Sequence, residues 1–125
     1  MSNITFAEIP LCVLQYIADK YLNFNDIINI IKINKKCNRI KIKDFYNIPD
    51  KIKNKLTNEI LNKYNDIEKL DANNNPKITN INHLEKLKTL CAYGDCGINN
   101  EGIKNLTNLK YFDASHNQKI TNINH

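Results

Sequence analysis

The 125-residue chain contains no tryptophan and only three glycines and three prolines. The three glycines, all within residues 94–102, do not match a phosphate-binding loop, and G-x-S-x-G and H-E-x-x-H motifs are absent, so the sequence carries none of these catalytic signatures. No apolar run approaches eighteen residues, which argues against a transmembrane helix. The first ten residues lack a basic segment and include Glu8, so no secretory signal is evident and we expect an intracellular, cytoplasmic location.

Metal-binding spacing is also missing. The chain has no C-x-x-C pair, and its three histidines, His83, His116 and His125, are not in the register of zinc ligands. We therefore expect no metal, no cofactor and no disulfide, with reduced thiols packing as small hydrophobic groups. The four cysteines are Cys12, Cys37, Cys91 and Cys96.

The formal net charge is +5, yet Arg39 is the only arginine. Recognition of phosphates and bases usually draws on arginine and on placed aromatic side chains, whereas the lysines here are spread along residues 32–63. Solvated helix faces explain this charge better than a specific nucleic-acid site. Weak, salt-sensitive adhesion to polyanions is compatible with it.

One phrase occurs twice. Residues 75–83 read NPKITNINH and residues 117–125 read NQKITNINH, identical at eight of nine positions and forty-two residues apart. Within that distance lies a shorter pattern, I/L-x-x-L/F-x-A-x-x-N/D, which begins at Ile67, Leu87 and Leu109. Self-similarity at such periods is typical of repeat proteins, in which each unit buries its apolar side against its neighbours.

This pattern resembles the leucine-rich repeat. The resemblance implies a short strand in the first half of each unit, and inward side chains at every second residue of that strand. The predicted inward strand residues are Leu70, Ala72, Leu90, Ala92, Phe112 and Ala114. The predicted core residues of the second halves are Ile78, Ile81, Leu84, Ile98, Ile103, Leu106, Ile120 and Ile123.

Asparagine ends the pattern in two of the three units. The amides of Asn75 and Asn117 can satisfy backbone groups left unpaired where the chain turns out of a strand. Asp95 is the departure, because a carboxylate accepts hydrogen bonds but donates none. We expect the middle turn to be bonded differently or to use the neighbouring Cys96.

The N-terminal part has helical periodicity. Pro10 can occupy the first turn of a helix whose apolar face carries Val13, Leu14 and Ile17. Asn23 then reads as the N-cap of a second helix, with Asp26 three residues further on, and a third helix would begin near residue 34.

The order of these elements resembles an F-box, with Ile9 in place of the usual leucine and Cys37 in place of a bulky aromatic residue. The resemblance implies binding to a Skp-type adaptor protein through apolar side chains that a tiny helical module cannot bury by itself. The predicted adaptor face consists of Pro10, Leu14, Ile17, Leu22, Ile27, Ile30 and Ile33.

Between the two parts, Asp50 can cap a helix with Ile52, Leu56, Ile60 and Tyr64 on one stripe. The predicted organisation is a helical F-box-like module at 1–47, a connecting helix at 48–66 and an incomplete repeat array at 67–125. The predicted fold class is therefore α/β, a leucine-rich repeat solenoid of about two and a half repeats preceded by an all-α three-helix module.

Together the resemblances imply a substrate-recognition adaptor of a Skp-cullin-F-box type ubiquitin ligase, which tethers a target protein and performs no chemistry itself. Two alternatives remain, namely a repeat scaffold without a ubiquitin role and a truncated, non-functional paralogue. An enzyme is the rival class, and its nearest catalytic set is Cys91, Asp113 and His116. The predicted partner-binding concave face consists of Lys69, Asp71, Asn73, Thr89, Cys91, Tyr93, Tyr111, Asp113 and Ser115.

Overall fold

The computed structural model describes residues 11–23, 25–26, 29 and 40–123. The chain divides into two compact units, residues 1–42 and residues 43–125. The segments predicted as a connecting helix and as the repeats thus belong to one unit, which begins at residue 43. Most of the predicted second and third N-terminal helices lies outside the described residues.

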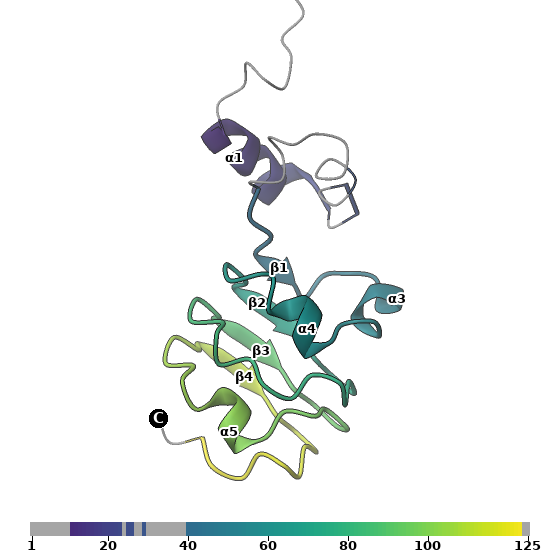
Figure 1. Cartoon of the computed structure of the whole chain (residues 1–125), viewed down its shortest axis with the longest axis vertical. Helices are drawn as coiled ribbons and strands as arrows, with labels where there is room; N and C mark the ends of the chain where they lie inside the picture. The colour runs from purple at the N-terminus through teal and green to yellow at the C-terminus, as the bar shows by residue number, and fades with distance from the viewer. Residues whose placement is uncertain (1–10, 24, 27–28, 30–39, 124–125) are drawn as a thin grey trace, which may run out of the picture. The chain divides into compact units, whose positions relative to one another are not determined.

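The second unit holds a four-stranded sheet whose strands are all parallel (Figure 1). The predicted fold class is wrong, because neither a three-helix module nor a leucine-rich repeat solenoid is evident in the described residues. The helix described in the first unit is α1 (Leu11–Tyr21), and the helices described in the second unit are single turns. Four strands of two or three residues form one small sheet, whereas the prediction extended the sequence repeat into an array.

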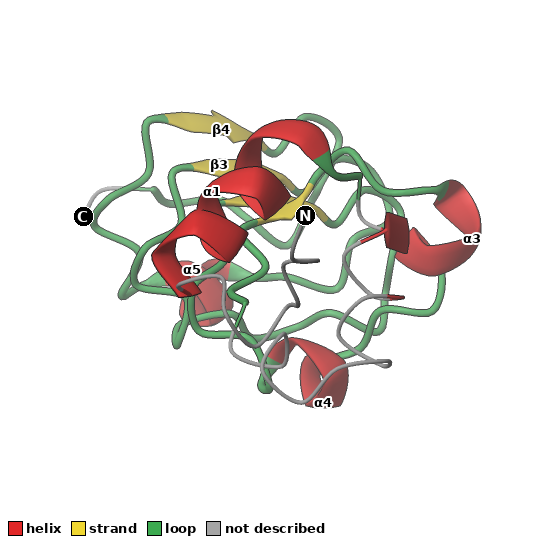
Figure 2. Ribbon diagram, turned by 90° about the horizontal axis from the view of Figure 1, so that it is seen from above, coloured by secondary structure: helices red, strands yellow, loops and turns green. Residues whose placement is uncertain are grey.

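The strands follow one another in the sheet in the order of the sequence. They are β1 (Asp44–Phe45), β2 (Lys69–Asp71), β3 (Thr89–Cys91) and β4 (Tyr111–Asp113). Leu70 pairs with Leu90, and Leu90 pairs with Phe112, so the spacing of the sequence pattern sets the register. Figure 2 shows β3 and β4 side by side, with loops and short helices on the return path between strands.

Alternation along the strands directs apolar side chains into the core. Leu70 and Leu90 are fully buried, as the alternation predicts. Phe112 and Ala114 are half-buried, because β4 has no described strand beyond it. The return segments supply the rest of the core, with fully buried side chains at Ile78, Ile81, Leu84, Leu87, Cys96, Ile98 and Ile103.

The predicted helix after Asp50 is two helices. α3 (Asp50–Lys53) and α4 (Asn58–Leu61) are separated by Thr57, whose backbone is extended at φ −136° and ψ 167°. The Thr57 hydroxyl accepts a hydrogen bond from the Ile60 N–H, which makes threonine the cap of a new helix and ends the old one. α5 (Asn100–Ile103) is capped in the same way by Asn99.

Buried asparagines hold the turns, as predicted. The Asn75 amide donates to the carbonyls of Lys53 and Leu56 at 3.1 and 3.0 Å, and its oxygen accepts from the Lys77 N–H at 3.0 Å. Asn117 makes the equivalent three bonds one forty-two-residue period later. In the middle turn Asp95 is exposed and the neighbouring Cys96 is fully buried, so Cys96 is the buried residue of this turn.

In the first unit, the apolar residues that the sequence placed on one face of α1 differ in exposure. Leu14 is buried and Val13 is 42% exposed. The Gln15 side chain donates to the carbonyl of Lys41 and accepts from its N–H, which fixes residues 40–42 against the helix. No helix among the described residues is long and apolar enough to cross a membrane.

Candidate functional site

The outward side chains of the strands form one surface, here called the strand face. Its first row follows the register from Lys69 to Thr89 to Tyr111. Its second row runs from Asp71 to Cys91 to Asp113. Tyr111 is 54% exposed, which makes it the exposed large hydrophobic side chain of the described strands.

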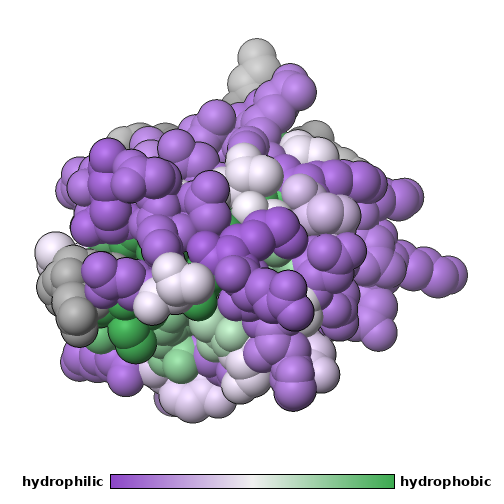
Figure 3. Space-filling model, turned by 90° about the horizontal axis from the view of Figure 1, so that it is seen from below, coloured by the Kyte–Doolittle hydropathy of each residue, from purple (hydrophilic) through white to green (hydrophobic). Residues whose placement is uncertain are grey.

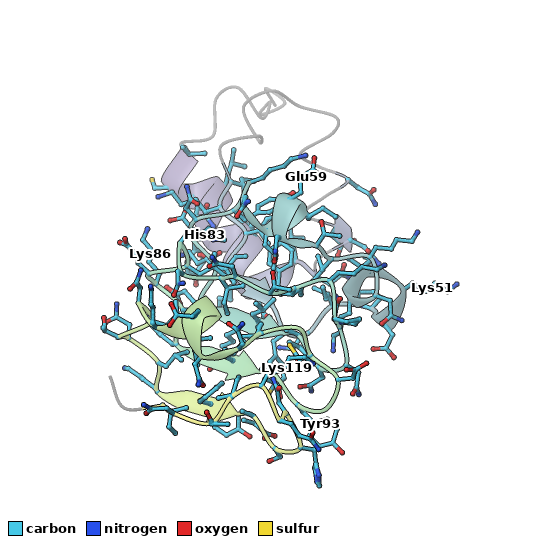
Figure 4. All side chains as sticks on the ribbon, turned by 60° about the horizontal axis from the view of Figure 1, so that its bottom comes forward. Lys51, Glu59, His83, Lys86, Tyr93 and Lys119 are labelled. Atoms are coloured by element: carbon cyan, nitrogen blue, oxygen red, sulfur yellow. The ribbon has the colours of Figure 1, made fainter. Side chains whose placement is uncertain are left out.

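An aromatic pair lies beyond the ends of β3 and β4. Tyr93 is 38% exposed, and its ring lies edge-on to the ring of His116, with 5.3 Å between centroids and 77° between planes. His116 has a positive φ of 59°, as do Asn74 (52°) and Gly94 (66°) at the equivalent positions of the two preceding turns. The left-handed conformation therefore recurs in three turns with three different residues, and in the third turn the residue is His116, whose imidazole contacts Tyr93. Figure 4 shows Tyr93 well separated from Lys86, another exposed side chain of the unit.

Cys91 is not available to a partner. It is 4% exposed, although the sequence placed it on the partner-binding face, and its Sγ lies 3.6 Å from the Tyr46 hydroxyl. Burial raises the pKa of the Cys91 thiol. The hydrogen bond to Cys91 and the charge of its thiolate raise the pKa of Tyr46 to about 12. Both groups are neutral at pH 7.

Charged groups beside Cys91 are paired within the protein. Asp71 forms an ion pair with Lys53, with 2.6 Å between Nζ and Oδ2, and Lys53 also lies 6.0 Å from the centre of the Tyr46 ring. The Asp113 carboxylate accepts a hydrogen bond from the Ser115 N–H at 2.9 Å. Hydrogen bonds from the Ser115 side chain and backbone lower the pKa of Asp113. On the two sides of the buried thiol, Asp71 is therefore neutralised by Lys53, whereas the Asp113 carboxylate is held by Ser115.

The other predicted partner-binding residues lie on or next to the strand face. Asn73 and Ser115 are exposed and follow the strands, while Thr89 is half-buried between Lys69 and Tyr111. The Asn73 side chain accepts a hydrogen bond from the Tyr93 N–H at 2.8 Å, which orders the turn that carries Tyr93. The polar residues around the tyrosines thus order the backbone of this surface and are themselves part of it.

The predicted adaptor face is only partly described. Leu14 is buried and Ile17 and Leu22 are half-buried, so these three do not form an exposed apolar stripe. Pro10, Ile27, Ile30 and Ile33 lie outside the described residues. Among the described side chains of α1, the exposed large apolar ones are Val13 and Tyr16, which the sequence did not assign to a site.

No catalytic or metal arrangement emerges from the described residues. No hydrogen bond joins Cys91, Asp113 and His116 there, and no group of three potential metal ligands occurs among them. A thiol with a raised pKa is a weak nucleophile at neutral pH, because the thiolate is the reactive form. His83 Nε2 lies 3.0 Å from the Leu61 carbonyl, so a backbone group engages this imidazole.

Three residues of the site escaped the sequence analysis: Tyr46, Lys53 and His116 as the partner of Tyr93. A signal for the first existed, because Ile42-x-x-Phe45 matches the start of the repeated pattern and Tyr46 follows directly. Asn47 stands where that pattern has alanine, which hid the strand β1. Nothing in the local sequence indicates that Lys53 reaches Asp71, eighteen residues away.

No family model, curated protein or solved structure matches the chain.

Proposed function

We propose that this chain is a protein-binding module that performs no chemistry, and that its strand face, together with the Tyr93–His116 pair, is the partner site. The observation that carries the proposal is the exposure of Tyr93 and Tyr111 on an ordered, polar surface. Tyrosine combines a large contact area with a hydroxyl group and is enriched among residues that dominate binding energy.

Rigidity of the surroundings supports the same function. The strands fix Tyr111 in register with Thr89, and the hydrogen bond that the Tyr93 N–H donates to the Asn73 side-chain oxygen holds the backbone of Tyr93. Anchors that are held before binding lose less conformational freedom on association, so more of their contact energy remains as affinity. Internally paired charges such as Asp71 with Lys53 do not need a new partner and can line the rim.

The test compares single substitutions in a direct binding assay. Partners captured by immobilised wild-type protein are purified, and their affinities are measured by biolayer interferometry. Tyr111→Ala and Tyr93→Ala are expected to weaken binding by about 2 kcal/mol each, or roughly thirtyfold in Kd. Lys86→Ala is the control, because Lys86 is exposed, forms an ion pair with Asp66 and lies away from Tyr93 (Figure 4). Equal and negligible losses in all three variants would place the partner site elsewhere.

A role as a ubiquitin-ligase adaptor stays a second proposal. It is favoured by the reciprocal bonds of Asn23 and Asp26, which match the expected start of a second helix within the F-box-like order. A pull-down with a purified Skp-type adaptor tests it. Val13→Asp with Tyr16→Asp is the informative variant, because both side chains are exposed, whereas Leu14→Asp would also unfold the unit. Absence of binding by the wild-type chain would leave the module without a ligase role.

A further inference from the structure

The free edge of β4 carries unpaired backbone groups in a self-complementary order. Tyr111 N–H donates to the Lys88 carbonyl and the Asp113 carbonyl accepts from Ala92, so these odd-numbered residues face β3. Strand geometry then turns the N–H and C=O of Phe112 to the opposite side, away from the sheet. No described strand lies there.

Two neighbouring groups complete this edge. In the earlier units, the Glu68 and Lys88 carbonyls each accept from the next strand, and Lys110 is the next residue in that row. The N–H groups of Ala72 and Ala92 likewise donate to the strand that follows, and Ala114 is the equivalent residue after β4. The centre of the edge therefore offers two donors and two acceptors. They are the N–H groups of Phe112 and Ala114 and the carbonyls of Lys110 and Phe112.

Below the edge the core is incompletely covered. Figure 3 shows apolar surface surrounded by hydrophilic side chains at the end of the molecule that carries β4. Leu109, Phe112 and Ile120 are half-buried and Ile123 is 57% exposed. An occupant of the edge must add apolar side chains on this side and polar ones on the strand face.

We propose that the occupant is a second copy of this chain, paired antiparallel along β4 about a two-fold axis at Phe112. This pairing joins each Phe112 N–H to the Phe112 carbonyl of the other copy, and each Ala114 N–H to its Lys110 carbonyl. Every donor named above then meets an acceptor. The two Phe112 side chains meet on the apolar side.

The same register makes the strand face complementary. It sets Tyr111 of one copy opposite Asp113 of the other in a pair without backbone hydrogen bonds, where side chains approach most closely. One oxygen of Asp113 accepts from Ser115, and a carboxylate has room for a further donor such as the Tyr111 phenol. An axis at Asp113 would instead set two carboxylates against each other, which disfavours that register.

The dimer joins two four-stranded sheets and sets two strand faces side by side. The dimer goes beyond the proposed partner site, because it forms through the backbone edge of β4. It can be detected from the molecular mass of the protein alone, with no partner present. A bivalent partner would gain effective concentration from it.

Sedimentation velocity of the whole chain in reducing buffer tests the pairing. We expect the mass to rise from 14.5 kDa toward twice that value as concentration increases. The midpoint is expected on the order of 100 µM, because the interface is small. Ala114→Pro deletes the outward N–H at a position where an edge strand tolerates proline, and it should weaken association roughly tenfold or more. Ala114→Val keeps the N–H and should not weaken association.

A double-mutant cycle fixes the register and does not depend on the proline variant folding. Tyr111→Phe and Asp113→Asn should each weaken the dimer several-fold, and the double variant should lose no more than the larger single effect. A chain that stays monomeric to about 1 mM, well above the expected midpoint, overturns the proposal. Tighter association of Asp113→Asn, or additive losses in the double variant, overturns the register about Phe112.

Discussion

Replacing Asn75 should test how much of the fold depends on the buried turn amides. Its side chain makes three hydrogen bonds at 3.0 to 3.1 Å and is 6% exposed. Asn75→Ala removes the side-chain partner of the Leu56 carbonyl and of the Lys77 N–H, and it leaves the Lys53 carbonyl with the Leu56 N–H as its donor. Each lost bond costs about 1 kcal/mol, more where the group stays buried, so we expect unfolding free energy to fall by about 2–4 kcal/mol.

A loss of that size is measurable in this protein. Domains of this kind are stable by about 5–15 kcal/mol, so the variant should still fold while its urea midpoint drops clearly. Urea titrations followed by circular dichroism at pH 7 give the difference. Asn65→Ala is the control, since Asn65 is exposed and the described residues record no hydrogen bond to its side chain. A change below about 0.5 kcal/mol in Asn75→Ala would refute the role of the amide.

Asn75→Asp adds a pH test at constant shape. The introduced carboxylate would face two carbonyl oxygens, which raises its pKa in the folded state above the unfolded value of about 3.9. The variant should therefore be least stable at pH 7 and should gain on the wild type as pH falls through the folded pKa, because protonation supplies a donor. A stability difference that stays constant from pH 7 to pH 4 would contradict this account.

Three further outcomes follow from the structure. Gly102→Ala should destabilise by about 1–3 kcal/mol in urea titrations, because a Cβ there would lie 2.2 Å from a backbone oxygen of the previous turn. In a dilute monomer, amide hydrogen exchange should be slow at Leu90, which has strands on both sides. It should be fast at Ile120, whose N–H donates a long hydrogen bond to the Asn117 carbonyl, with 3.3 Å between nitrogen and oxygen. Absorbance titration should find Tyr46 largely un-ionised at pH 11, and Cys91→Ala should lower its pKa from about 12 toward 10.

The register of the strands was predictable because it depends on spacing alone. Leu70, Leu90 and Phe112 recur at spacings of twenty and twenty-two residues, and they pair across β2, β3 and β4 as the repeated pattern predicts. The two asparagine turns were predictable for the same reason. The overall fold class was not predictable in this way, because the repeated pattern does not give the number of units that pack together into one compact domain.

Failures at the site have a tertiary cause. Alternation gives the side of the sheet from which Cys91 projects, but it does not state what lies above that side. Tyr46, forty-five residues earlier, contacts the thiol and removes it from solvent. The prediction of one continuous helix after Asp50 was wrong for a local reason. The Thr57 hydroxyl accepts a hydrogen bond from the Ile60 N–H and so caps a new helix at a position where the first helix was expected to continue.

The fold separates residues that hold the turns from residues that face solvent. Asn75 and Asn117 are buried, and each makes three hydrogen bonds to the backbone. The preceding residue in each turn, Asn74 or His116, is exposed and has a positive φ. That second position can therefore vary in chemistry at little cost to the scaffold. Because His116 occupies it beside Tyr93, changing either ring should alter partner binding and leave unfolding free energy within about 0.5 kcal/mol, the range of ordinary surface substitutions.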